Sequence, residues 1–242
     1  MNTFFLDRLN SEPHALAFAG QSTPWPVALA DQSANPALDE ALHTHAAAAQ
    51  ALLYPVSAEL LATTGRPVDL FGFEPNPARL GAAAAASASV PGIALTQLGA
   101  LLDAAALGYN PAQAKPVAVL GHSQGVLAVH MVQAICEAGS IDAAAAKIDE
   151  ILAIATLIGV AGTRQARQLG LAARHGEATP MLSVKDITRA QVDALIERVD
   201  GARGPIAVAV TNSATHYVLS DYPEDLAAFG VEVAKEHKRQ AK

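Results

Sequence analysis

The stretch that decides the fold is KPVAVLGHSQGVLAVHMVQAICEAG, residues 115–139. It begins with a short, mostly apolar run at 115–120, which is typical of a buried strand. It ends in an apolar helical pattern that starts at Val126 and stops at Gly139. The five residues between strand and helix, GHSQG, form a sharp turn with glycine at both ends. A strand, a turn and a helix in this order are half of a β-α-β unit, so the stretch predicts an α/β fold with a parallel sheet.

The turn matches G-x-S-x-G, the nucleophile elbow, in which a strained strand-to-helix turn aims a serine hydroxyl into a cleft. Gly121 and Gly125 are needed because side chains at these positions would strike the neighbouring strand and helix. The motif is a weak signal by itself and a strong one between a strand and a helix. Ser123 is therefore the candidate nucleophile. The alternative is that its hydroxyl only caps the helix.

An oxyanion hole needs two donors beside the nucleophile. The backbone N–H of Gln124 and the dipole of the helix that follows are placed to stabilise negative charge near Ser123. The second donor should come from a loop that follows another strand. Residues 14–19 are predicted to form such a strand, and Gly20-Gln21 follows it. We assign the second donor to Gln21, whose alternative role is that of an ordinary polar turn residue.

The remaining patterns predict two domains. Helices are expected at 35–61 with a break at Pro55, at 91–107 and at 141–168. The later patterns predict a strand at 180–184, a helix at 188–199, strands at 206–210 and 216–219 joined by a hairpin at 211–215, and a helix at 222–237 that Asp221 caps. This order is a ferredoxin-like unit without its last strand. We expect a hydrolase-like three-layer body with a parallel sheet at 1–177 and an incomplete ferredoxin-like subdomain at 178–242.

Composition narrows the class of protein. The 242 residues are 51% hydrophobic, with alanine as the largest part of the apolar count, and only 5% aromatic, which predicts a helix-rich soluble protein. The presence of a single cysteine fits a reducing cytoplasm. Polar residues and a proline interrupt the apolar stretch 82–107, so no membrane span is expected, and the amino terminus lacks the pattern of a signal peptide. A net charge of −7 argues against a nucleic-acid partner. The single cysteine, Cys136, excludes an internal disulfide and a multi-thiolate metal site, and a buried helical position is expected for it.

These motifs together carry a resemblance. AFAGQ at 17–21, GYNP at 108–111, the strand leading into GHSQGVLAV and the ferredoxin-like pattern resemble the acyl-CoA:ACP transacylases. The stretch SVPGIALTQ at 89–97 and the residues after the elbow resemble the N-terminal acetyl/acyltransferase domain of type I fatty acid synthases from mycolic-acid-producing actinobacteria. The resemblance covers essentially the whole chain and is most specific at the elbow and at Gly20-Gln21.

The resemblance implies roles for particular residues. Ser123 would form the acyl-enzyme, the N–H groups of Gln21 and Gln124 would form the oxyanion hole, and Asn212 would help to position the catalytic histidine. An acetyl group would pass from CoA to Ser123 and then to the phosphopantetheine of an acyl carrier domain. No metal or cofactor would be bound by this domain itself. The other domains of a homo-oligomeric synthase particle would be its partners.

Two departures from the family pattern refine this expectation. Transacylases that use malonyl-CoA grip its carboxylate with an arginine, and the matching position here is Ala161. A charge-assisted hydrogen bond contributes about 1.5–3 kcal/mol, so its loss favours an acetyl or another uncharged acyl group by about one to two orders of magnitude.

The family's general base is a histidine in a hydrophobic-His-Ser/Thr-Pro motif. None of the eight histidines has this context, so the base is expected beyond residue 242, in the rest of an interrupted domain. Without the base, the 242-residue chain is expected to have little activity alone.

Two other functions share some of these features. An α/β-hydrolase esterase or thioesterase also uses G-x-S-x-G, but it needs a downstream acid and histidine and an HGGG-type loop, which are not visible. A catalytically idle scaffold fragment of a multienzyme would keep the fold and leave Ser123 unused. With acetyl-CoA, a stable acyl mass addition rather than free acetate separates a transacylase from an esterase, and acylation that is lost in Ser123→Ala separates it from a scaffold.

Overall fold

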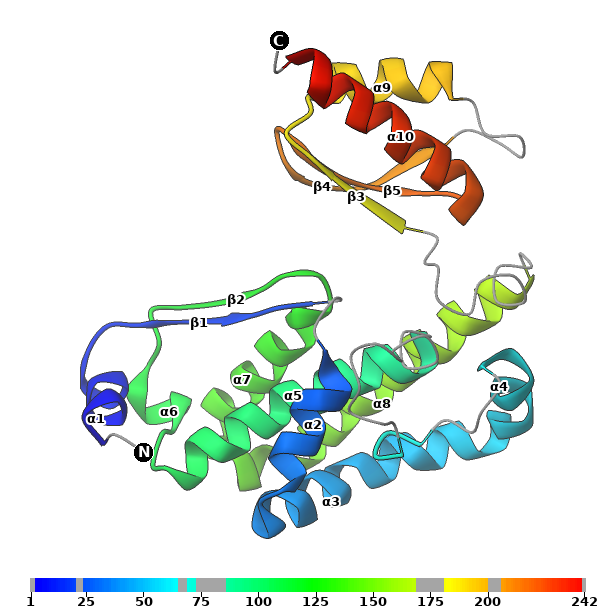
Figure 1. The fold of residues 1–242 in the computed structure, drawn as a ribbon. Helices are drawn as coiled ribbons and strands as arrows, with labels where there is room; N and C mark the ends of the chain where they lie inside the picture. Colours follow the sequence, from blue (N-terminus) through cyan, green and yellow to red (C-terminus); the bar gives the residue numbers. More distant parts are fainter. Residues whose placement is uncertain are drawn as a thin grey trace. The chain divides into compact units, whose positions relative to one another are not determined.

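The computed structural model describes residues 3–20, 24–64, 69–72, 86–168, 181–199 and 206–240. The chain divides into two compact units, Met1–Ala172 and Ala173–Lys242 (Figure 1). Each unit has a buried apolar core of its own. The predicted domain boundary after residue 177 lies outside the described residues.

The first unit is mainly helical. Its elements, in order, are α1 (Thr3–Ser11), β1 (Ala15–Phe18), α2 (Trp25–Ser33), α3 (Pro36–Leu53), the 3-10 turn η1 (Tyr54–Val56), α4 (Ser57–Thr64), α5 (Ala86–Ala106), α6 (Pro111–Ala114), β2 (Ala118–Gly121), the 3-10 turn η3 (Ser123–Gly125), α7 (Val126–Ala138) and α8 (Ile141–Gln168). The predicted strand, turn and helix around the elbow are confirmed as β2, η3 and α7. Strands β1 and β2 pair in parallel, with Phe18 opposite Gly121.

The helix bounds follow from local signals where these are strong. Asn35 caps α3 by accepting a hydrogen bond from the N–H of Ala37 at 3.2 Å, and Pro36 takes the first helical position. The predicted break at Pro55 is confirmed as η1. Helix α5 begins five residues earlier than predicted and passes through Pro91. Helices α1, α2 and α6 were not predicted, because none of them is longer than nine residues and short helices leave a weak pattern in the sequence.

Helix α5 forms the centre of the first unit, where it packs against α2, α3, α7 and α8. Gly92 lets it approach α2, since a Cβ there would lie 2.5 Å from Cε3 of Trp25. By length and hydropathy alone α5 is able to cross a membrane, but 67% of its apolar window is buried inside the protein. This is weak evidence for a span, because the buried core helix of a soluble protein has the same properties.

The sheet of the first unit is covered on one face. Leu16, Phe18 and Val119 pack against the helical core, whereas Leu120 on the other face is 60% exposed. Figure 1 shows α5, α7 and α8 on a single side of β1 and β2. The described residues of this unit therefore form two layers. The α/β class is supported, and the three-layer hydrolase-like body is not confirmed.

The second unit has the predicted β-α-β-β-α order. It consists of β3 (Met181–Lys185), α9 (Arg189–Arg198), β4 (Ala207–Ser213), β5 (His216–Ser220) and α10 (Pro223–Gln240). The three strands are antiparallel in the order β3-β5-β4. Thr188 caps α9 in a capping box with Gln191.

The predicted hairpin at 211–215 is wrong in part. Strand β4 runs on to Ser213, and only Ala214 and Thr215 form the turn. Irregularities in the pairing with β5, one of them between Thr211 and Ser213, let the strand continue through polar residues that the sequence assigned to a loop.

Gly230 in α10 provides a stability prediction. A Cβ at this position would lie 3.8 Å from Cδ2 of Leu182, an ordinary contact distance. Because glycine costs a helix interior about 0.5–1 kcal/mol relative to alanine, Gly230→Ala is expected to stabilise the second unit by about that amount. A higher urea midpoint in circular dichroism would show it. Gly139→Ala is the opposite control. Gly139 has a φ of +90°, where a side chain is strained, so this substitution should lower the urea midpoint. A lowered midpoint for Gly230→Ala would contradict the prediction.

Candidate active site

Ser123 lies in a strained turn directly after β2. Its φ is +54°, which is uncommon for a residue with a side chain and costs about 1–3 kcal/mol. Two hydrogen bonds hold the turn: the N–H of His122 donates to the carbonyl of Phe18 at 3.0 Å, and the N–H of Gly125 donates to the carbonyl of His122 at 2.9 Å. Ser123 is exposed. This is the strand-to-helix turn that the motif predicts.

The glycines of the turn are required by close packing. A Cβ at Gly121 would lie 2.5 Å from the carbonyl carbon of Gly125, and a Cβ at Gly125 would collide with the carbonyl oxygen of Phe18. The turn thus folds back on itself and against the end of β1. The steric reason given for both glycines from the sequence is confirmed.

The loop after β1 lies against the same turn. Because β1 and β2 are parallel, their carboxyl ends meet at one edge of the sheet, where α/β proteins bind ligands. A Cβ at Gly20 would lie 2.7 Å from Cβ of Ser123 and 3.1 Å from the backbone nitrogen of Gln124. The structure therefore brings Gly20, Ser123 and Gln124 together. Gln21, the predicted second oxyanion donor, lies outside the described residues.

Gln97 is a residue of the site that was not predicted from the sequence. This residue of α5 is 9% exposed, and its Nε2 donates a hydrogen bond of 2.5 Å to the carbonyl oxygen of Ala19, next to Gly20. In the sequence, Gln97 is a polar amide in a mostly apolar helix and the last residue of the stretch 89–97 that carries the family resemblance, but neither signal shows its contact with Ala19. The contact depends on how α5 packs, which no local pattern encodes.

Asn212 lies in the second unit, on β4. Its Nδ2 is 3.4 Å from Nε2 of His216, and the same Nε2 is 2.9 Å from Oγ of Ser183. Asn212 is thus beside a histidine, but this histidine lacks the family motif, and the role of Asn212 toward the catalytic histidine stays a prediction. Strand pairing brings the three residues together, and no spacing in the sequence shows it.

Ala161 is exposed on α8. Two residues further on, Oγ1 of Thr163 accepts a hydrogen bond of 2.8 Å from the N–H of Ser87, at the amino end of α5. Gln97, which reaches the elbow loop, is ten residues further along α5, or about 15 Å at the helical rise per residue. The structure places Ala161 opposite the far end of α5 from Gln97 and does not bring it to Ser123.

The nearby Arg164 is held by another partner. Its guanidinium binds both carboxylate oxygens of Glu59, at 2.9 to 3.1 Å. This hydrogen-bonded pair keeps the pKa of Glu59 below its usual value. Arg164 therefore does not replace the carboxylate-binding arginine that position 161 lacks.

Cys136 corrects an expectation. It is exposed on α7 rather than buried. Partial desolvation and the neighbouring Glu137 raise the pKa of its thiol. A raised pKa keeps the sulfur protonated, so Cys136 has no property of a second nucleophile.

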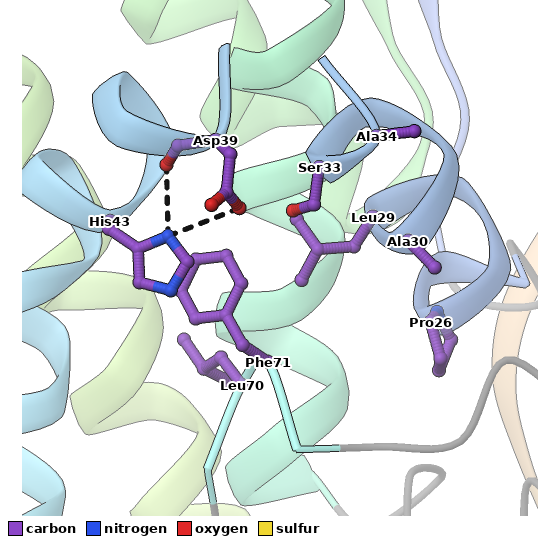
Figure 2. A pocket seen from close by; sticks show the side chains of 9 residues that line it. All are labelled: Pro26, Leu29, Ala30, Ser33, Ala34, Asp39, His43, Leu70 and Phe71. Atoms are coloured by element: carbon purple, nitrogen blue, oxygen red, sulfur yellow. Dashed lines mark hydrogen bonds and ion pairs between the residues drawn. The ribbon is translucent and has the colours of Figure 1, made fainter. Parts of the chain in front are cut away.

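A pocket of about 400 Å³ lies elsewhere in the first unit, between α2, α3 and residues 69–72 (Figure 2). The ring of His43 stacks on that of Phe71 with 3.7 Å between centroids. Nδ1 of His43 faces Asp39, with 2.9 Å to its carbonyl and 3.2 Å to Oδ1. None of the lining residues belongs to the elbow. Among the described residues, no three His, Cys, Asp or Glu side chains are grouped closely enough to hold a metal.

Comparisons with solved structures show the fold. The chain is similar to the malonyl-CoA–acyl carrier protein transacylase of Coxiella burnetii, with a TM-score of 0.51 and 16% identity over 93% of this chain and 58% of that one. It is equally similar to PlMCAT, a malonyl-transacylase solved in complex with the type II polyketide acyl-carrier protein AntF, with a TM-score of 0.51 and 16% identity over 93% and 60% of the two chains. The chain therefore spans about 60% of the length of these structures.

Comparison with curated protein sequences finds no match. A family model matches residues 74–242, more than half of the chain, and its description is the starter unit:ACP transacylase in aflatoxin biosynthesis, SAT. The matched range contains the elbow and the whole β-α-β-β-α unit. By this match, the chain belongs to the SAT family of starter unit:ACP transacylases.

Proposed function

We propose that this chain carries the nucleophile of an acyl-CoA:ACP transacylase, which moves an acyl starter group from CoA through an ester of Ser123 to the phosphopantetheine thiol of an acyl carrier protein. The observation that carries the proposal is Ser123 itself, held at a φ of +54° with the backbone of Gly20 packed against it. Strain of this kind persists at functional sites. The family match supports the choice of an acyl carrier protein as acceptor.

The proposed reaction is a ping-pong reaction of two acyl transfers, first to Ser123 and then to the carrier thiol. Oγ of Ser123 attacks the thioester carbonyl of acyl-CoA while a base takes its proton. The C–S bond breaks, and CoA leaves as a thiol after it receives that proton. The phosphopantetheine thiol then attacks the serine ester, the C–O bond breaks, and Ser123 regains its proton. No metal or cofactor takes part in the proposed steps.

The backbone around Ser123 is suited to stabilise the oxyanion of each step. The N–H of Gln124 lies in the first turn of the helical segment η3–α7, whose amino end favours negative charge. Gln21 is the proposed second donor, and Asn212 is proposed to hold the catalytic histidine. The general base is proposed to be a histidine outside this chain. The proposed setting is a cytoplasmic type I fatty acid synthase of several domains.

The proposal predicts a preference among acyl-CoA donors. The preference is taken from the motif and not from the position of Ala161 in the structure: alanine stands where the family pattern has the arginine that binds a malonyl carboxylate, so acetyl-CoA is expected to acylate Ser123 about 10- to 100-fold faster than malonyl-CoA. Intact-mass spectrometry with each donor gives the rates, and peptide mapping identifies the acylated residue. A preference for malonyl-CoA would contradict the proposed acetyl specificity.

A second assay separates the reaction classes. The acetylated chain is mixed with a holo acyl carrier protein, and acetyl-thioester and free acetate are both measured. A transacylase gives the thioester, an esterase gives acetate without transfer, and a scaffold gives no ester on Ser123. Either of the last two outcomes, measured in a protein that also contains the proposed histidine base, overturns the proposal.

A further inference from the structure

Gln97 joins the central helix of the first unit to the loop that lies on the nucleophile. Its side chain is buried in α5, and its Nε2 donates to the carbonyl oxygen of Ala19 at 2.5 Å. Ala19 follows β1 directly and precedes Gly20. One side-chain hydrogen bond therefore fixes the direction of the Ala19 carbonyl.

That carbonyl determines where Gly20 lies. The peptide bond is planar, so fixing the direction of the Ala19 carbonyl fixes the plane of the whole Ala19–Gly20 unit. Gly20 in turn has no space to shift toward the elbow, since a Cβ there would lie 2.5 Å from the carbonyl oxygen of His122 and 2.7 Å from Cβ of Ser123. A rotation of this peptide plane would move the backbone that packs on the nucleophile.

Burying the polar side chain of Gln97 is unfavourable, so we expect its amide to make an interaction that an apolar residue could not. Its Oε1 is buried and has no hydrogen-bond partner among the described residues. An unmatched buried acceptor is unfavourable, so methionine or leucine would serve better if the position only filled space. The donor that Gln97 gives to Ala19 is the interaction that an apolar residue cannot provide.

From these contacts we infer that Gln97 is a positioning residue, which sets the reactivity of Ser123 by holding the Ala19–Gly20 peptide against the elbow. It acts through the backbone and does not touch the substrate. The inference rests on the proposed role of Ser123 as nucleophile, and it adds a residue from a different helix to that site.

Gln32 offers a matched control. It too is an amide that donates from Nε2 to a backbone carbonyl, that of Thr96 at 2.9 Å, and its Oε1 is also buried without a partner among the described residues. Its hydrogen bond ties α2 to α5 and does not reach the loop after β1. Gln97→Met and Gln32→Met therefore remove the same kind of interaction, and only Gln97→Met removes it from the loop that packs on Ser123.

The test uses a fluorophosphonate probe on the full chain. Oγ of Ser123 displaces fluoride from phosphorus and its proton leaves to solvent, so labelling reports reactivity without CoA. Gln97→Met is expected to lower the maximal labelling rate about 10- to 100-fold with the probe's half-saturating concentration unchanged, because small misplacements of reacting groups have effects of this size. Gln97→Glu, whose carboxylate would face the Ala19 carbonyl, should lose more. Gln32→Met should label at the wild-type rate with a similar fall in thermal midpoint.

The outcomes are distinguishable. Equal labelling rates for Gln97→Met and wild type, or equal losses for Gln97→Met and Gln32→Met, overturn the inference. A wild-type Ser123 that the probe does not label overturns it as well, since no reactive serine is then being positioned. If Gln97→Met is labelled slowly and a protein that also contains the proposed base still accepts no acyl group from any acyl-CoA, the inference is supported and the proposed function is overturned.

Discussion

Replacing Ser123 by alanine is expected to remove acyl-ester formation, with a loss of at least about 10⁴-fold in the rate of acylation by acetyl-CoA. The reason is geometric as well as chemical. Ser123 is the residue that the elbow holds at a φ of +54°, exposed at the carboxyl edge of β2 and at the start of a helix. Alanine at this position keeps the backbone and removes only the attacking oxygen. Intact-mass spectrometry after incubation with acetyl-CoA measures the loss.

Ser183→Ala is the matched control for this variant. Oγ of Ser183 is 2.9 Å from Nε2 of His216, so it has the histidine contact of a serine nucleophile. It lies on the regular strand β3, however, and its φ is not positive. Its loss is expected to leave acylation unchanged. Equal acylation of Ser123→Ala and wild type, or loss of acylation in Ser183→Ala alone, would move the nucleophile away from the elbow.

Local signals were sufficient where a residue acts on its own backbone. The glycines at 121 and 125 predicted the turn, and the periodic pattern predicted a helix over residues 188–199, which the structure shows as α9, capped by Thr188. The register of β3, β4 and β5 decides which residues meet on the second unit, and the sequence does not specify it. The group of Ser183, Asn212 and His216 was therefore not predicted.

The site shows the same division between local and long-range causes. Ser123 and Gln124 were found because the elbow is continuous in sequence. Gln97 was not, since its contact with Ala19 spans 78 residues and depends on the packing of α5. Similarly, Ala161 was assigned from a motif, while the structure places it opposite the amino end of α5. A motif shows which residue types are present. The packing of the helices decides which of these residues lie near the nucleophile.

Gly20→Ala is expected to disturb the site from the loop after β1, without changing any residue of the GHSQG turn. The added Cβ would meet the carbonyl oxygen of His122 at 2.5 Å and Cβ of Ser123 at 2.7 Å, so the loop or the elbow must shift. Overpacking of this kind costs about 1–3 kcal/mol. Displacement of Ser123 by about 1 Å should lower its labelling by the fluorophosphonate probe about 100-fold.

Two measurements separate the effect on the site from the effect on the fold. Urea unfolding gives the stability of Gly20→Ala, and labelling at a temperature well below its midpoint gives the reactivity of the folded protein. Gly230→Ala adds the same methyl group where there is space for it, and it should keep the wild-type labelling rate. If folded Gly20→Ala is labelled within twofold of wild type, the loop after β1 does not control the nucleophile. A 100-fold loss would instead place Gly20 in the site, because a methyl group with no chemistry of its own acts there only by moving Ser123.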